Sequence, residues 1–187
     1  MIKLKDILNE MIARNLFVES KKLRVFDFDD TLVQTTSYIY VKLPNGKEKK
    51  LTPGQYAVYN EKPGEEYDFR DFYSVQNPQE FKKVTKVLKR ILDKSRGDGV
   101  YILTARPQAV EKHVHQYLKD IGINHKIPVI GLQSNNPQDK AKWVEKMIDS
   151  EGYDDIYFAD DSEKNVNSMK SMLRRKDVKW RVQLIKH

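Results

Sequence analysis

RVFDFDDTLV (residues 24–33) is a short apolar strand that ends in three carboxylates, Asp27, Asp29 and Asp30. A buried carboxylate needs a partner or gives up its charge, so strands of a protein interior rarely end in a cluster of like charges. The cluster therefore predicts that a cation lies at the end of this strand. The groups that share this cation have to come from other parts of the chain.

Size and composition set the protein class. The chain of 187 residues is long enough for one domain with a core and a small insertion. It has no cysteine, which excludes disulfides, thiolate metal sites and a cysteine nucleophile and fits a reducing compartment, so we expect a cytoplasmic location. No apolar run approaches the ~20 residues that span a bilayer, and no secretory signal is visible. The net charge of +7 favours anionic partners, or it only keeps the chain in solution.

The order of strands and helices predicts an α/β fold. Short apolar strands alternate with helical patterns from residue 23 onward, and the stretch VYILT (100–104) is typical of a strand that is buried on both faces. This alternation indicates a Rossmann-like three-layer α/β/α sandwich with a mostly parallel five-stranded sheet. The helix at 78–95 is expected to begin with Asn77 as its N-cap and Pro78 in its first turn. The other strands are expected at 23–28, 127–130, 155–159 and 180–185.

Two segments lie outside this alternation. Residues 1–20 carry apolar side chains at helical spacing, which predicts an amphipathic helix before a domain at 21–187. A small β-rich insertion is expected at about 33–77, with a hairpin that turns at Pro44-Asn45-Gly46. The insertion holds six of the ten tyrosines. They either form a wall on which a flat group stacks or, as we favour, the core of the insertion.

Polar residues follow the predicted strands, where ligands bind in parallel sheets. The first strand delivers Asp27, Asp29 and Thr31 to this edge of the sheet. The second delivers Thr104, the fourth delivers Asp160 and Asp161, and Lys140 starts the helix before the fourth strand. Carboxylates from two strands, a hydroxyl and a lysine describe a site for a hard divalent cation, Mg²⁺, together with a phosphate.

These motifs resemble the haloacid dehalogenase (HAD) superfamily of phosphohydrolases, in its small-capped form. The matching pieces are DFDDT, the threonine of ILTAR, a lysine at a helix start, and ADDSEKN, in that order between residues 23 and about 185. The chain departs from the family at Asp30, where glycine is common, and both Lys140 and Lys142 fit the lysine position. We favour Lys140, because Trp143 and Val144 then lie on the buried face of the helix.

The resemblance implies a role for each residue of the site. Asp27 would be the nucleophile and Asp29 the general acid and base, with Lys140 as a fixed positive charge. Mg²⁺ would be held by Asp27, by the backbone carbonyl of Asp29 and by Asp160 or Asp161. The residues implied to bind the substrate phosphate are Thr31, Thr104, Ala105, Arg106 and Lys140, and Arg106 is also expected to grip a second phosphate or a nucleic-acid strand.

The function so implied is that of a Mg²⁺-dependent phosphomonoester hydrolase that forms an aspartyl-phosphate. The expected substrate is a nucleotide or a phosphorylated nucleic-acid end. The alternatives are another small phosphometabolite, or a catalytically silent protein that keeps the fold for binding or structure.

The N-terminal segment has three interpretations. It packs on the domain, it mediates self-association, or it is a leader. MIKLKDILNE (residues 1–10) resembles the short leaders that route internal proteins into the heads of tailed phages, which are cut after patterns such as Leu8-Asn9-Glu10. That resemblance implies a phage-encoded protein of the host cytoplasm that is packaged in the virion.

Overall fold

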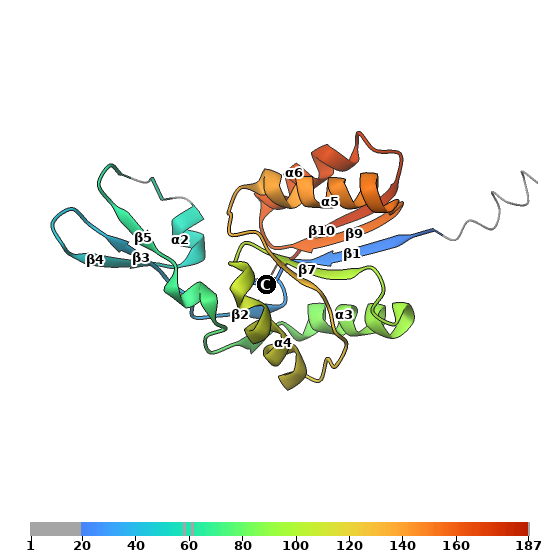
Figure 1. Cartoon of the computed structure of the whole chain (residues 1–187), viewed down its shortest axis with the longest axis horizontal. Helices are drawn as coiled ribbons and strands as arrows, with labels where there is room; N and C mark the ends of the chain where they lie inside the picture. The colour runs from blue at the N-terminus through green and yellow to red at the C-terminus, as the bar shows by residue number, and fades with distance from the viewer. Residues whose placement is uncertain (1–19, 58, 61, 187) are drawn as a thin grey trace, which may run out of the picture.

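The central element of the fold is a parallel sheet of five strands. The computed structural model describes residues 20–57, 59, 60 and 62–186. The strands of the sheet stand in the order β10-β9-β1-β7-β8, and every neighbouring pair is parallel (Figure 1). The prediction of an α/β fold with a five-stranded parallel sheet is thereby confirmed. The strands are β1 (Lys22–Phe26), β7 (Val100–Thr104), β8 (Val129–Gly131), β9 (Asp155–Asp160) and β10 (Lys179–Leu184).

Helices cover both faces of this sheet. α5 (Pro137–Glu151) and α6 (Glu163–Leu173) lie on one face, and α3 (Lys82–Ser95) and α4 (Glu111–Asp120) lie on the other (Figure 1). Side chains alternate along a strand, so Val25 of β1 contributes to the core under α5 and α6 while Phe26 contributes to the core under α3 and α4. Close packing in the two cores fixes the positions of the strands, and with them the points at which the loops leave the strand ends.

Capping residues fix where two of the helices begin. The side chain of Asn136 accepts a hydrogen bond from the backbone N–H of Gln138, and Pro137 is the first residue of α5. The side chain of Ser162 accepts from the backbone N–H of Asn165 at the start of α6. These caps satisfy N–H groups that a helix start leaves free. Each cap places residues of the first helix turn beside the carboxyl ends of the strands.

The predicted start of the helix at 78–95 is wrong. α3 begins at Lys82, because Gln79–Glu80 forms a strand, β6, that pairs antiparallel with β2 (Val33–Gln34). Asn77 has a left-handed backbone (φ 42°), and its side chain donates to Thr36 Oγ1 at 3.0 Å, so it caps no helix. The pairing of these two strands, between residues 45 and 47 positions apart, takes precedence over the local capping pattern. After β7, a 3₁₀ turn (Gln108–Val110) leads into α4.

The insertion is a small three-stranded antiparallel sheet beside the core (Figure 1). It comprises β3 (Ile39–Lys42), β4 (Glu48–Leu51) and β5 (Glu66–Asp68), with the short helix α2 (Pro53–Ala57), and the 3₁₀ turn η1 (Arg70–Tyr73) leads back to the core. Tyrosine and phenylalanine side chains pack on its buried aliphatic residues, as expected for an insertion that builds its own core. They are Tyr56, Tyr59, Tyr67 and Phe72, packed on Ile39, Val41 and Leu51.

The predicted N-terminal helix at 1–20, with the leader pattern at Leu8-Asn9-Glu10, lies outside the described residues, apart from Ser20. Within the described part of the chain, the helices are all too short or too polar to cross a bilayer.

We expect that replacing Gly99 by alanine destabilises the protein by about 3 kcal/mol. Gly99 has φ +66°, and a Cβ at this position would overlap the backbone carbonyl oxygen of Lys22 at the start of β1. Urea denaturation of Gly99→Ala and Gly54→Ala tests this, since a Cβ on Gly54 meets open space. Equal stability of the two variants would contradict the packing of Gly99 against the start of β1.

Candidate functional site

Three aspartates meet at the carboxyl end of the sheet, at the edge that faces the insertion (Figure 1). Asp27 follows β1 directly, Asp160 is the last residue of β9, and Asp161 is the next residue. One carboxylate oxygen from each lies within 4.8 Å of the others. Asp27 and Asp160 are buried, with 5% and 0% of their surface exposed, and Asp161 is half-buried. We call these three residues the acidic triad.

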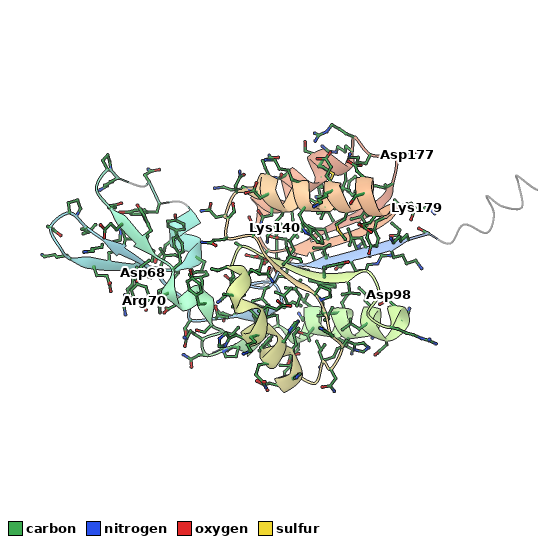
Figure 2. The ribbon with its side chains drawn as sticks, in the orientation of Figure 1. Asp68, Arg70, Asp98, Lys140, Asp177 and Lys179 are labelled. Atoms are coloured by element: carbon green, nitrogen blue, oxygen red, sulfur yellow. The ribbon has the colours of Figure 1, made fainter. Side chains whose placement is uncertain are left out.

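Lys140 lies between two members of the acidic triad. Its Nζ donates to Asp27 Oδ1 at 2.6 Å and to Asp160 Oδ2 at 2.7 Å, and the residue is 4% exposed. It reaches this place from the first turn of α5, which begins beside the carboxyl ends of the strands (Figure 2). The side chain of Lys142, the alternative, is 72% exposed. The structure therefore brings Lys140, and not Lys142, to the triad.

Burial and crowding shift the pKa values in the triad. Burial raises the pKa of Asp27 well above its usual value; the ammonium of Lys140 opposes this rise, and the charges of Asp160 and Asp161 add to it. Burial, with the neighbouring Asp160 and Asp30, raises the pKa of Asp161 to about 6. Burial lowers the pKa of Lys140, but Asp27 and Asp160 outweigh burial and raise it overall. The lysine therefore stays charged, while the carboxylates carry an electrostatic cost.

Hydrogen bonds from nearby residues hold the triad in place. The hydroxyl of Thr31 lies 3.0 Å from Asp27 Oδ2 and 3.2 Å from Asp161 Oδ1, and it accepts from the backbone N–H of Asp161 at 3.1 Å. The side-chain amide of Asn165 donates to both oxygens of Asp160, at 3.0 and 3.1 Å. Each carboxylate of the triad is thus oriented by a hydrogen bond from a neighbouring side chain, which is typical of ligands that are held ready for a metal.

The donor set of the triad fits a divalent cation. Three carboxylates and one ammonium leave two negative charges when all are ionised. Carboxylate oxygens are the ligands that Mg²⁺ prefers, and a bound cation would remove the repulsion among them. The three carboxylates expected as metal ligands are therefore together. The carboxylate of Asp29, which was expected to be the general acid and base, has a partner outside the triad.

That partner is Arg106. Its Nε and Nη2 each donate to one oxygen of Asp29, both at 2.7 Å. Nη2 also donates to the hydroxyls of Thr35 and Ser37, and Nη1 donates to the backbone carbonyls of Asp71 and Ser74. The residue is 1% exposed. The expectation that Arg106 grips a phosphate thus differs from its contacts here, because acceptors of the chain itself engage every nitrogen of the guanidinium.

The remaining predicted residues lie at the end of β7. Thr104 is fully buried, and its hydroxyl accepts from the backbone N–H of Arg106 at 3.2 Å. Ala105 is exposed. Asp30 follows Asp29 in a tight turn and has φ 52°, a conformation that aspartate tolerates better than most residues. An aspartate at position 30 is therefore compatible with the turn.

Two contacts of the site were not predicted from the sequence, although Asn165 is the last residue of the ADDSEKN motif. Asn165 follows Asp160 by five residues in the first turn of α6, and its place after a strand-end aspartate is a local signal for the contact. The pairing of Asp29 with Arg106 joins residues 77 positions apart. It has no local signal.

We expect Lys140→Met to lower the free energy of unfolding by about 3 kcal/mol at neutral pH without divalent cations. The substitution leaves Asp27 and Asp160 buried without the ammonium that both contact. Lys142→Met is the matched control, because it removes an exposed lysine from the same helix. Urea denaturation in EDTA provides the measurement, and equal effects of the two substitutions would contradict the buried ion pairs.

A second prediction separates repulsion from cation binding. In EDTA, Asp161→Asn should raise the free energy of unfolding, because it removes one of three crowded negative charges. With Mg²⁺ at about ten times its Kd, the unchanged protein should gain about 1.4 kcal/mol, and the variant should lose most of this gain. Asp177→Asn, at an exposed position (Figure 2), is the control. A variant that is destabilised in EDTA and keeps the full Mg²⁺ effect would rule out a shared cation.

Comparisons of the chain with protein-family models, with curated proteins and with solved structures give no match. What the structure establishes is a parallel α/β sheet with small antiparallel β insertions and a buried acidic triad that could bind a metal ion.

Proposed function

We propose that this protein is a Mg²⁺-dependent phosphomonoester hydrolase of the haloacid dehalogenase type, which works through an aspartyl-phosphate. The observation that carries the proposal is the meeting of Asp27, Lys140, Asp160 and Asp161 at the carboxyl end of one parallel sheet. These four residues come from three elements and match, in order, the motifs of that superfamily. In this proposal the sheet and its helices form a Rossmann-like three-layer domain at 21–187, and the insertion at about 33–77 is its cap.

Asp27 is the nucleophile in this mechanism. Its carboxylate attacks the phosphorus of the ester, and an oxygen–phosphorus bond forms as the bond to the leaving group breaks. The leaving oxygen takes a proton from Asp29, two residues further along the chain. The side chain of Asp29 remains 20% exposed beside Arg106, so a substrate oxygen can approach it.

Water then completes the reaction. Asp29, now ionised, takes a proton from a water molecule while the water oxygen attacks the phosphorus of the aspartyl-phosphate. The bond between phosphorus and the Asp27 oxygen breaks, which frees inorganic phosphate and restores the carboxylate. Splitting one displacement into two in this way is the usual advantage of a covalent intermediate.

The other residues neutralise and position charge. Lys140 donates to two carboxylates in the described structure, and an ammonium has three protons, so one is left for a phosphate oxygen. The backbone around Thr104 and Ala105 and the hydroxyl of Thr31 are the further groups that we assign to the phosphate. The residues that would hold Mg²⁺ are Asp27, Asp160 and Asp161, with the backbone carbonyl of Asp29. Bound Mg²⁺ supplies the charge neutralisation that lets a carboxylate meet a phosphate dianion.

Asp27→Asn tests the nucleophile. We expect the unchanged protein to hydrolyse p-nitrophenyl phosphate in the presence of Mg²⁺, and we expect hydrolysis to stop when EDTA is added. The variant should lose activity by on the order of 10³-fold or more, because an amide cannot form the intermediate. Release of p-nitrophenol measures turnover, and acid-quenched protein incubated with labelled phosphate ester shows the aspartyl-phosphate.

Asp98→Asn, an exposed position on the loop before β7 (Figure 2), is the control and should keep full activity. Circular dichroism establishes that both variants are folded. Full activity in Asp27→Asn would refute the nucleophile. An unchanged protein that binds Mg²⁺ and phosphate without turnover would instead identify a silent binding protein with this fold.

A further inference from the structure

A cavity of about 500 Å³ lies between the core and the insertion. Its walls come from β2 and the segment after it, from the start of α2, and from β6. Asp30, the residue that follows Asp29, stands on the wall. Sites for small ligands are typically of this size.

Direct contacts connect the cavity to Asp29. Thr35, which lines the cavity, donates to Asp29 Oδ1 at 3.2 Å. Ser37, on the same wall, accepts at 2.9 Å from the guanidinium of Arg106, which is paired with Asp29. In the proposed reaction Asp29 gives its proton to the leaving oxygen. The rest of the leaving group would therefore extend into this cavity.

The walls of the cavity are polar but almost uncharged. Eleven described residues line it, and none of these is lysine or arginine, although the whole chain has 34. Five of them carry a hydroxyl and three carry a side-chain amide, and Asp30 is the single acid among them. Lys50 lies 5.9 Å from the ring centroid of Tyr38 but does not line the cavity. The walls can therefore exchange many neutral hydrogen bonds and offer no cation.

We infer that the substrate carries a single phosphate on an uncharged, hydroxyl-rich leaving group of the size of a monosaccharide, which this cavity binds. The inference rests on the proposed function and narrows it. Hydroxyl and amide side chains both donate and accept, so they suit a ligand whose hydroxyls do the same. Gln34 and Gln79 face each other across the pair of β2 and β6, and both are exposed to the cavity.

A phosphorylated nucleic-acid end fits these walls poorly. Its further phosphates are normally bound by lysine and arginine, and a wall whose one charge is a carboxylate repels them. Bases stack on aromatic side chains, and Tyr38 is the one aromatic residue among the described lining residues. The sequence-based expectation of a nucleic-acid end is thus the weaker of the two substrate classes.

Three substrates separate this inference from the proposed function. Hydrolysis of p-nitrophenyl phosphate measures phosphatase activity as such. Hydrolysis of ribose 5-phosphate tests binding of a sugar in the cavity, and hydrolysis of a 3′-phosphorylated oligothymidylate tests binding of a nucleic-acid end. We expect kcat/KM for ribose 5-phosphate to exceed that for the oligonucleotide by about tenfold or more at low salt, and to change little with salt. Preference for the oligonucleotide would overturn the inference and leave the proposed function standing. Hydrolysis of none of the three would refute both.

Substitutions on the wall give a second readout. Gln79→Leu should lower kcat/KM for ribose 5-phosphate by about fivefold relative to p-nitrophenyl phosphate, chiefly through KM, because a neutral hydrogen bond is lost. Gln79→Lys should shift the ratio toward the oligonucleotide and make it depend on salt. Gln116→Leu, at an exposed position on α4, is the matched control and should change neither ratio. Unchanged ratios in both Gln79 variants, with folding verified by circular dichroism, would place the leaving group outside this cavity.

Discussion

A buried ammonium between two buried carboxylates is the interaction on which the site depends. Lys140 joins the ends of β1 and β9 to the first turn of α5, and it is the one cation that contacts the acidic triad among the described residues. Burying charge is costly unless the charges are paired and hydrogen-bonded. The pairing is therefore tolerated only because the strands and the capped helix hold all three groups at hydrogen-bonding distance. Packing in the two cores holds the strands and helices in place, so the positions of these charged groups depend on the sheet.

Much of this arrangement could be predicted from the sequence, because its signals are local. Apolar runs mark the strands, and parallel strands place their carboxyl ends at one edge, so Asp27, Asp160 and Asp161 were expected together. Asn136 and Pro137 mark the start of α5, and the apolar positions of this helix distinguish Lys140 from Lys142. In each case, a pattern of neighbouring residues predicts a strand or helix, and the regular geometry of that element then predicts where its side chains lie.

The features that escaped prediction are set by contacts between distant residues. The pairing of β6 with β2 shortens α3 at its start, although Asn77 and Pro78 form a good capping pattern. The place of Arg106 was also missed, because its partners lie on the loop after β1 and in the insertion. Arg106 was predicted to bind phosphate because it follows Thr104 in the sequence. That local pattern does not reveal the acceptors from distant parts of the chain that contact its guanidinium in the folded protein.

The contacts of Arg106 have a mechanical consequence for the insertion. One side of the guanidinium holds the carboxylate of Asp29, and the other holds the backbone carbonyls of Asp71 and Ser74, where the chain leaves the insertion. If the insertion moved away from the sheet, these carbonyls would lose their hydrogen bonds to the buried guanidinium of Arg106, or the guanidinium would move with them. The orientation of the Asp29 carboxylate and the position of the insertion are therefore coupled through the side chain of Arg106.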